Sequence, residues 1–203
     1  MTNLSKTPPS LSGTPVSILT VCGLDELAGH GAGRVSHVLS ILDPDWPDPE
    51  AFKTWDPHRR TILHFHDAIE PAPGIRLPQP EHVRAILAFG RSLAEDEREA
   101  DGHLLVHCHA GISRSTAAMA MMMAQAEPGT EADVIVERLH AIREKAWPNL
   151  VMIEMADAML GRAGRLTAAV ARLYRRQLEV RPQLAELMRG LNRDRELSLA
   201  AQA

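Results

Sequence analysis

The sequence has few cysteines and few aromatic residues, and it has no long apolar run. Its 203 residues include two cysteines, which excludes a framework of disulfides and favours a reducing compartment. Because no run of roughly 18 apolar residues occurs, we expect neither a transmembrane helix nor a membrane partner. Positive charge is also scarce: 22 lysines and arginines stand against 26 aspartates and glutamates, a net charge of -4. This balance excludes a strongly basic nucleic-acid-binding protein.

The rest of the composition is typical of a globular protein. It is 45% hydrophobic and 24% charged, and a chain of this length is expected to form one domain with short additions. Residues 1–14 are rich in serine, threonine and proline, and they lack the apolar stretch of a signal peptide. We therefore expect a flexible leader on a cytoplasmic protein, with the domain starting at residue 15.

Four short runs of apolar and β-branched residues predict strands. A loop with four prolines separates the second run from the third, and it has room for a short helical turn. The predicted strands are 15–22, 36–42, 61–66 and 102–107, and the loop is 43–57.

Apolar residues at helical spacing predict helices between and after these strands. The segment 113–126 is apolar on almost every side, so its helix should be buried. Thr130 and Asp133 form a capping pattern at the start of the next helix. The charged segment 166–199 predicts one or two further helices. Two more helices are predicted, at about 80–96 and 148–160.

The alternation of strands and helices predicts an α/β fold. We expect a mostly parallel sheet of about four to five strands flanked by helices, with extra helices at the C-terminal end. Such sheets bind their ligands beyond the carboxyl ends of the strands. Cys108 directly follows the fourth predicted strand and therefore lies at this edge.

The segment around Cys108 carries the strongest functional pattern. A strand ends, a short loop with a glycine follows, and a helix begins at Ser113. Inward-facing N–H groups of the loop and the positive end of the helix make an anion site that favours a thiolate. The planar guanidinium of Arg114 suits two oxygens of a phosphate. A thiolate beneath a bound tetrahedral anion predicts covalent phosphoryl transfer.

The same residues resemble a known signature. His107-Cys108, five residues and then Arg114-Ser115 are similar to the signature of the cysteine-based protein tyrosine phosphatases. The form HCHAGISRS is most similar to the dual-specificity branch of that family. The resemblance spans about 16–160, and it includes three later residues that match the family pattern: Arg143, Pro148 and Asn149.

The resemblance implies a fold, an activity and a division of the chain. The phosphatase domain would be 15–164, and 165–203 would be a C-terminal helical extension without a counterpart in the family. The activity would be hydrolysis of phosphate monoesters through a phosphocysteine intermediate. Phosphotyrosine in a protein is the favoured substrate, with phosphoserine, phosphothreonine or a small phosphate monoester as further substrates.

The family roles transfer to individual residues of this sequence. Cys108 would be the nucleophile, Arg114 would bind the phosphate, and Ser115 would ease the departure of the thiolate. His107 would support the loop. No metal or other cofactor is implied, because Arg114 and the N–H groups supply the positive field. The phosphate-binding backbone would be that of His109, Ala110, Gly111, Ile112 and Ser113.

The general acid would come from a loop after an earlier strand. Asp67 fits this position, because it follows the third predicted strand and precedes a loop with two prolines and a glycine. It lies 41 residues before Cys108, towards the long side for the family. Glu70 is the rival for this role, and Asp56 is a more distant alternative.

Other features have alternative interpretations. Cys22 is either a plain buried thiol or a partner that traps oxidised Cys108 as a disulfide. The histidines near the strand ends are expected in the core or at the rim, with a zinc site as the weaker alternative. The arginines after residue 161 either cover solvated helix faces or form a docking surface for an acidic partner. Those arginines are at positions 162, 165, 172, 175, 176, 181 and 189.

Two other functions stay open from the sequence. The site could bind phosphate without turnover, or it could act on inositol or lipid phosphates. The single tyrosine, Tyr174, leaves no tyrosine-bearing loop of the kind that deep phosphotyrosine pockets use, which favours a shallow pocket. The absence of lysine from the segment 107–115 weakens the phosphoinositide interpretation.

Overall fold

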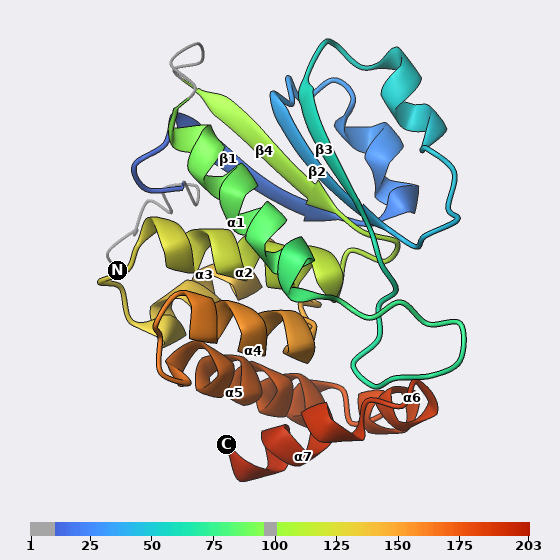
Figure 1. Ribbon diagram of the computed structural model, residues 1–203, viewed down its shortest axis with the longest axis vertical. Helices are drawn as coiled ribbons and strands as arrows, with labels where there is room; N and C mark the ends of the chain where they lie inside the picture. Colours follow the sequence, from blue (N-terminus) through green and yellow to red (C-terminus); the bar gives the residue numbers. More distant parts are fainter. Residues whose placement is uncertain (1–10, 96–100) are drawn as a thin grey trace, which may run out of the picture.

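The computed structural model describes residues 11–95 and 101–203, so most of the predicted leader lies outside the described residues. Four strands in the described part form one parallel sheet in the order β1-β4-β2-β3 (Figure 1). The α/β prediction is confirmed, and the third strand starts and ends two residues earlier than predicted. The strands are β1 (Val16–Cys22), β2 (His37–Leu42), β3 (Arg59–His64) and β4 (Gly102–His107).

The alternation of side chains along the central strands creates two hydrophobic clusters. Leu104 and Val106 of β4 belong to the large core, whereas Leu105 belongs to a smaller cluster with Val38. Successive residues of a strand face opposite sides of the sheet, so the two clusters lie on its two sides. Every residue of β2 and β4 is buried, which fits central strands covered on both faces.

Helices α1 (Pro80–Ala94) and α2 (Arg114–Ala126) cover the large-core face of the sheet (Figure 1). As predicted, α2 is buried, and its methionines fill the core. Helix α3 (Ala132–Ile142) begins after Glu131 without a side-chain cap, so the predicted cap at Thr130 is wrong. The Thr130 hydroxyl donates to Glu127 instead, which removes it from the helix start. Helix α4 (Leu150–Met159) follows with Asn149 as its N-cap.

The C-terminal segment forms three helices, whereas the sequence predicted one or two. They are α5 (Arg165–Val180), α6 (Leu184–Gly190) and α7 (Asp194–Gln202). Helix α5 packs on α3, α4 and α7, and its Leu166, Val170 and Tyr174 belong to the same core as the sheet. Tyr174 stacks on Trp147, with ring centroids 4.5 Å apart. The extension therefore shares its hydrophobic core with the rest of the chain.

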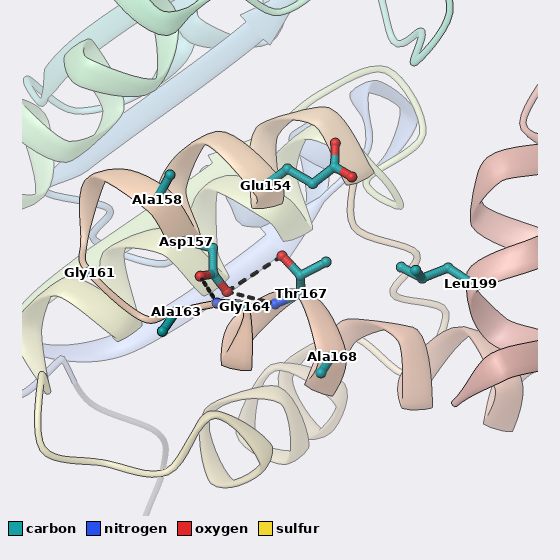
Figure 2. Close-up of a pocket in the computed structure, with 9 residues that line it drawn as sticks. All are labelled: Glu154, Asp157, Ala158, Gly161, Ala163, Gly164, Thr167, Ala168 and Leu199. Atoms are coloured by element: carbon teal, nitrogen blue, oxygen red, sulfur yellow. Dashed lines mark hydrogen bonds between the residues drawn. The ribbon is translucent and has the colours of Figure 1, made fainter.

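A groove of about 660 Å³ lies where α4, α5 and α7 meet (Figure 2). Two acidic residues, Glu154 and Asp157, line it, and Asp157 accepts hydrogen bonds from the backbone N–H groups of Gly164 and Thr167. These bonds satisfy amide groups at the start of α5, so the carboxylate serves the turn between α4 and α5. In the described part of the chain, no helix combines the length and the apolar character that crossing a membrane needs.

Two short 3-10 helices, η1 (Leu24–His30) and η2 (Glu50–Thr54), lie on the other face of the sheet (Figure 1). The second confirms the helical turn predicted within the proline-rich loop.

Helix η1 starts where β1 ends, and this junction touches the loop after β4. The Leu24 N–H donates to the His109 carbonyl at 2.9 Å. Gly111 has a φ of 67°, and a Cβ there would lie 2.3 Å from the Cys22 carbonyl carbon.

We predict that Gly111→Ala destabilises the protein by more than about 1 kcal/mol, because its Cβ meets backbone atoms and φ is positive. Gly129→Ala is the matched control, since nothing lies within 4 Å of the Cβ position there. Its effect should stay within about 0.5 kcal/mol. Urea unfolding of both variants tests the contact. Equal stability of the two variants would contradict it.

Candidate active site

Cys108 occupies the first position after β4, at the carboxyl edge of the sheet. Its side chain is buried, and its Sγ lies 3.2 Å from the Oγ of Ser115 in the first turn of α2. The loop 108–113 connects this strand to α2, as the sequence predicted. The sulfur of Cys108 and the hydroxyl that can hydrogen-bond to it are thus held between a strand end and a helix start.

The carbonyl groups of the loop point outward to partners in other parts of the chain. Gly111 accepts from the Nε of Arg143 at 2.9 Å, and Ile112 accepts from the backbone N–H of Trp147 at 2.9 Å. The Ser113 carbonyl accepts from the backbone N–H of Asn149 at 3.3 Å. With its carbonyl groups engaged in this way, the loop can direct its N–H groups to the opposite side, which is the arrangement that a backbone anion site needs.

Arg143 ties the loop to the segment after β1. Besides Gly111, it donates to the Ala110 carbonyl at 3.2 Å and forms a two-pronged ion pair with Glu26, at 2.9 and 2.8 Å. The hydrogen bonds from Arg143 lower the pKa of Glu26, so the pair stays charged at neutral pH. Glu26 also accepts from the Gly23 N–H at 2.6 Å. Arg143 therefore holds the outer side of the loop.

Arg114 is buried, and one of its nitrogens is fixed by neighbouring strand ends. Its Nη1 donates to Asp43 Oδ1 at 2.7 Å and to the Phe65 carbonyl at 2.5 Å. Within the described part of the chain, its Nε is buried without a hydrogen-bond partner. An unpaired buried donor is costly and needs an explanation. A phosphate oxygen at the loop would be a suitable acceptor for it.

Asp67 lies beside the loop, as the sequence predicted for the general acid. Its Oδ1 accepts from the Ser113 hydroxyl at 2.7 Å and from Asn149 Nδ2 at 3.0 Å, and it lies 3.5 Å from Arg193 Nη1. Burial by itself raises the pKa of Asp67. The charges of Arg193 and Arg114, together with the two hydrogen bonds, outweigh burial and lower this pKa below its ordinary value.

The two alternative acids have other surroundings. Glu70 is partly buried and pairs with Arg195 of α7 at 3.5 Å. Asp56 is exposed just after η2, and its backbone carbonyl lies 2.8 Å from the ring of His58. Only Asp67 of these three carboxylates has a hydrogen bond to the loop among the contacts of the described residues.

The histidines around the site have structural partners. His107 Nε2 lies 2.6 Å from the Ser40 hydroxyl, and burial followed by the charge of Arg60 lowers the pKa of His107 to about 4. It is therefore a neutral support beneath the loop. His109 accepts from the Asp43 N–H at 3.2 Å, and its ring lies 4.3 Å from that of Trp46. Within residues 11–95 and 101–203, no group of three or more potential metal ligands comes together.

Cys22 packs on the side of the sheet away from Cys108. It belongs to the smaller cluster with Val35 and Val38, whereas Cys108 belongs to the large core. Burial, followed by the charge of Glu26, raises the pKa of Cys22 to about 12. This environment disfavours the reactive thiolate and supports the interpretation as a plain buried thiol.

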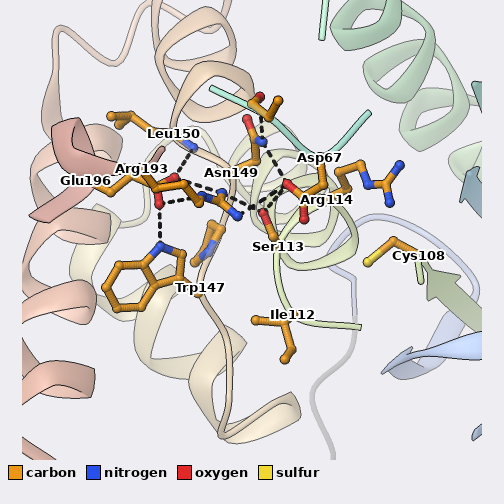
Figure 3. A network of polar contacts seen from close by, with 12 residues as sticks. Asp67, Cys108, Ile112, Ser113, Arg114, Trp147, Asn149, Leu150, Arg193 and Glu196 are labelled. Atoms are coloured by element: carbon orange, nitrogen blue, oxygen red, sulfur yellow. Dashed lines mark hydrogen bonds and ion pairs between the residues drawn. The ribbon is translucent and has the colours of Figure 1, made fainter. Parts of the chain in front are cut away.

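Sequence reasoning missed three residues of the site. Asp43 directly follows β2, so the rule that ligand-binding groups gather at the carboxyl edge could have indicated it. Arg193, just before α7, contacts Asp67 and Ser113, and Glu196 of α7 binds Arg193 (Figure 3). No local pattern distinguishes them from the exposed charges of the same segment.

Comparisons with known proteins agree with this geometry. A family model described as protein-tyrosine phosphatase matches residues 52–156, more than half of the chain. No curated protein matches it. Human DUSP28 has a TM-score of 0.53 at 15% identity, covering 71% of this chain and 92% of that one. Tk-PTP in the active form has a TM-score of 0.51 at 16% identity, covering 78% and 99%.

A third solved structure gives the same fold. A mouse putative dual specificity phosphatase complexed with zinc tungstate has a TM-score of 0.50 at 17% identity, covering 83% of this chain and 96% of that one. These structural likenesses establish the fold, and the family model matches the segment that contains Asp67 and the whole Cys108 loop. The chain therefore belongs to the protein-tyrosine phosphatase family.

Proposed function

We propose that this phosphatase hydrolyses phosphate monoesters through a phosphocysteine intermediate, with protein phosphotyrosine as its main substrate. The buried guanidinium of Arg114 carries the proposal. Asp43 and the Phe65 carbonyl hold Nη1, while the buried Nε has no partner among the described residues. Together with the N–H groups of the loop, this donor supports a tetrahedral anion next to Cys108.

The first step transfers the phosphoryl group to sulfur. The Cys108 thiolate attacks phosphorus, the S–P bond forms, and the P–O bond to the leaving group breaks. Arg114 and the loop N–H groups stabilise the charge on the equatorial oxygens. Asp67 donates its proton to the leaving oxygen, so a neutral alcohol or phenol departs. No metal or cofactor enters this step.

The second step returns the enzyme to its starting state. A water molecule attacks phosphorus and gives its proton to the Asp67 carboxylate, while the S–P bond breaks and inorganic phosphate forms. The Ser115 hydroxyl, 3.2 Å from Sγ, stabilises the departing thiolate with a hydrogen bond.

The proposed acid needs a proton that the free enzyme holds weakly. The positive charges that lower the pKa of Asp67 include Arg114, which is also the proposed phosphate ligand. A bound phosphate dianion would offset that positive charge and raise the proton affinity of Asp67. Protonation of the acid is thereby coupled to substrate binding.

An exposed aromatic side chain supports phosphotyrosine as the substrate. Trp46 is 45% exposed, and its ring lies 4.3 Å from that of His109 in the loop. A phosphotyrosine ring bound above the loop could stack on such a surface. We also propose that a phosphorylated protein is the physiological partner and that the protein acts in the cytoplasm, where its two free cysteines stay reduced.

The division of the chain follows the same proposal. Residues 15–164 would carry the phosphatase domain, and 165–203 would be a helical extension. The shared core and the contact between Arg193 and Asp67 support an extension that takes part in the site.

We predict that Cys108→Ser lowers hydrolysis of p-nitrophenyl phosphate to background, because a hydroxyl is a far weaker nucleophile than a thiolate. The wild-type activity should persist with a chelator present.

Ser115→Ala should slow the second step, so that mass spectrometry of acid-quenched enzyme detects phosphorylated Cys108. Activity that depends on added metal, or that survives in Cys108→Ser, would contradict the mechanism.

We predict that Asp67→Asn lowers kcat for a phosphotyrosine peptide by roughly 10²- to 10⁴-fold, because the leaving oxygen loses its proton donor. Glu70→Gln is the matched control from the same loop and should retain most of the activity. Steady-state kinetics with both variants decides between the two carboxylates. A large loss in Glu70→Gln alone would assign the acid to Glu70.

The same experiment separates catalysis from phosphate binding without turnover. If the wild type binds the peptide but hydrolyses it at a negligible rate, and no variant changes that rate, the chain is a phosphate-binding module. A panel of phosphopeptides and inositol phosphates tests the substrate class, and a preference for inositol phosphates would overturn phosphotyrosine.

A further inference from the structure

Arg193, just before α7, is a buried cation that reaches the candidate site from the C-terminal extension (Figure 3). Its side chain is 4% exposed. Its Nη2 donates to the Ser113 hydroxyl at 2.8 Å, and its Nη1 lies 3.5 Å from Asp67 Oδ1. Ser113 in turn donates to the same oxygen of Asp67. One guanidinium thus contacts both the loop and the proposed acid.

Glu196 fixes the position of this guanidinium through an ion pair. The two carboxylate oxygens of Glu196 pair with Nη2 and Nε of Arg193, at 2.9 and 2.8 Å. The same carboxylate accepts from Trp147 Nε1 at 2.5 Å and from the Leu150 N–H at 3.1 Å. Glu196 is completely buried, so these contacts fix its position. The guanidinium therefore has a fixed place relative to the segment that supports the loop.

We propose that Arg193 is a positioning residue for the general acid: its guanidinium holds Asp67 and Ser113 in register. The proposal rests on the phosphatase function proposed above. A buried arginine–glutamate pair alone is a weak stabilising device, because desolvation offsets the attraction. Arg193 also contacts Ser113 and Asp67, so this pair acts on the candidate site as well as on stability.

The charged and titratable groups around Asp67 come from several elements. Among the described residues they are Arg114 of α2, His109 of the loop, Tyr174 of α5 and Arg193 before α7, and Glu196 of α7 pairs with Arg193. Arg193 and Arg114 are the cations that lower the pKa of Asp67. Burial opposes the charge of Arg193, but the carboxylates of Asp67 and Glu196 raise its pKa, so it stays charged.

The sign of the effect on catalysis follows from these charges. The acid must be protonated in the first step, so kcat falls as pH rises through the pKa of Asp67 in the substrate complex. Arg193 lowers this pKa. Removing its charge raises the pKa and moves the falling limb of the kcat profile to higher pH.

The experiment compares kcat–pH profiles for phenyl phosphate, a substrate with a poor leaving group. In Arg193→Gln the falling limb should move to higher pH, while the plateau at low pH should drop roughly tenfold because the acid is less well placed. Arg193→Lys retains the charge, so its falling limb should stay near that of the wild type. Arg189→Gln removes an exposed arginine of α6 and serves as the matched control.

A double-mutant cycle tests whether Arg193 acts through Asp67. In an Asp67→Asn background, Arg193→Gln should lower kcat less than twofold, because the group it positions is gone. A purely structural role would lower kcat by the same factor in both backgrounds. Such additivity would overturn the proposal. A folded Arg193→Gln variant whose kcat–pH profile falls at the same pH as that of the wild type would also overturn it.

Folding and function have separate controls. Arg193→Gln leaves the buried carboxylate of Glu196 without its cationic partner. The double variant Arg193→Gln/Glu196→Gln therefore provides a protein with neither charge. Its falling limb should also move to higher pH, and an unmoved limb would count against the proposal. If the wild type shows no hydrolysis that depends on Cys108, the proposed function itself fails. If the wild type is active but the kcat–pH profiles of the variants fall at the same pH as its own, only the role of Arg193 is refuted.

Discussion

The orientation of the peptide groups in the loop after β4 is the constraint on which the site depends. An anion site of backbone N–H groups forms only if the carbonyl groups turn the other way and find partners there. Arg143, Trp147 and Asn149 supply those partners from the segment between α3 and α4. The backbone of the loop also lies so close to the end of β1 that neither Gly23 nor Gly111 has space for a Cβ. Elements far apart in sequence thus create the local geometry.

This geometry has an electrostatic cost, which the surrounding carboxylates offset. Arg114 is almost completely buried, and a buried cation without a partner is strongly unfavourable. Asp43 compensates it at Nη1, and the buried Nε, which has no partner among the described residues, is the donor that we propose for phosphate. Arg193 is compensated in the same way by Glu196. Each cation therefore has one close carboxylate partner, and Arg193 also lies 3.5 Å from Asp67.

The sequence predicted the features that depend on local pattern. The apolar run of β4, the apolar character of α2 and the signature around Cys108 are each contained in one short segment. Asp67 could be proposed from its place after a predicted strand, and the structure puts it beside the loop. Its proposed role as the acid stays a prediction. The cap predicted at Thr130 was wrong because Glu127 takes its hydroxyl.

Contacts between distant elements could not be predicted in this way. In sequence, Arg193 is another arginine of a charged tail whose other members include Arg172 and Arg176. Those two form exposed ion pairs with Asp133 and Glu137, and such pairs contribute little. What separates Arg193 from these two arginines is burial, and its burial depends on how α7 packs on α5. Packing alone thus places one arginine of this segment against Ser113 and Asp67, and this contact is the basis of the role that we propose for it.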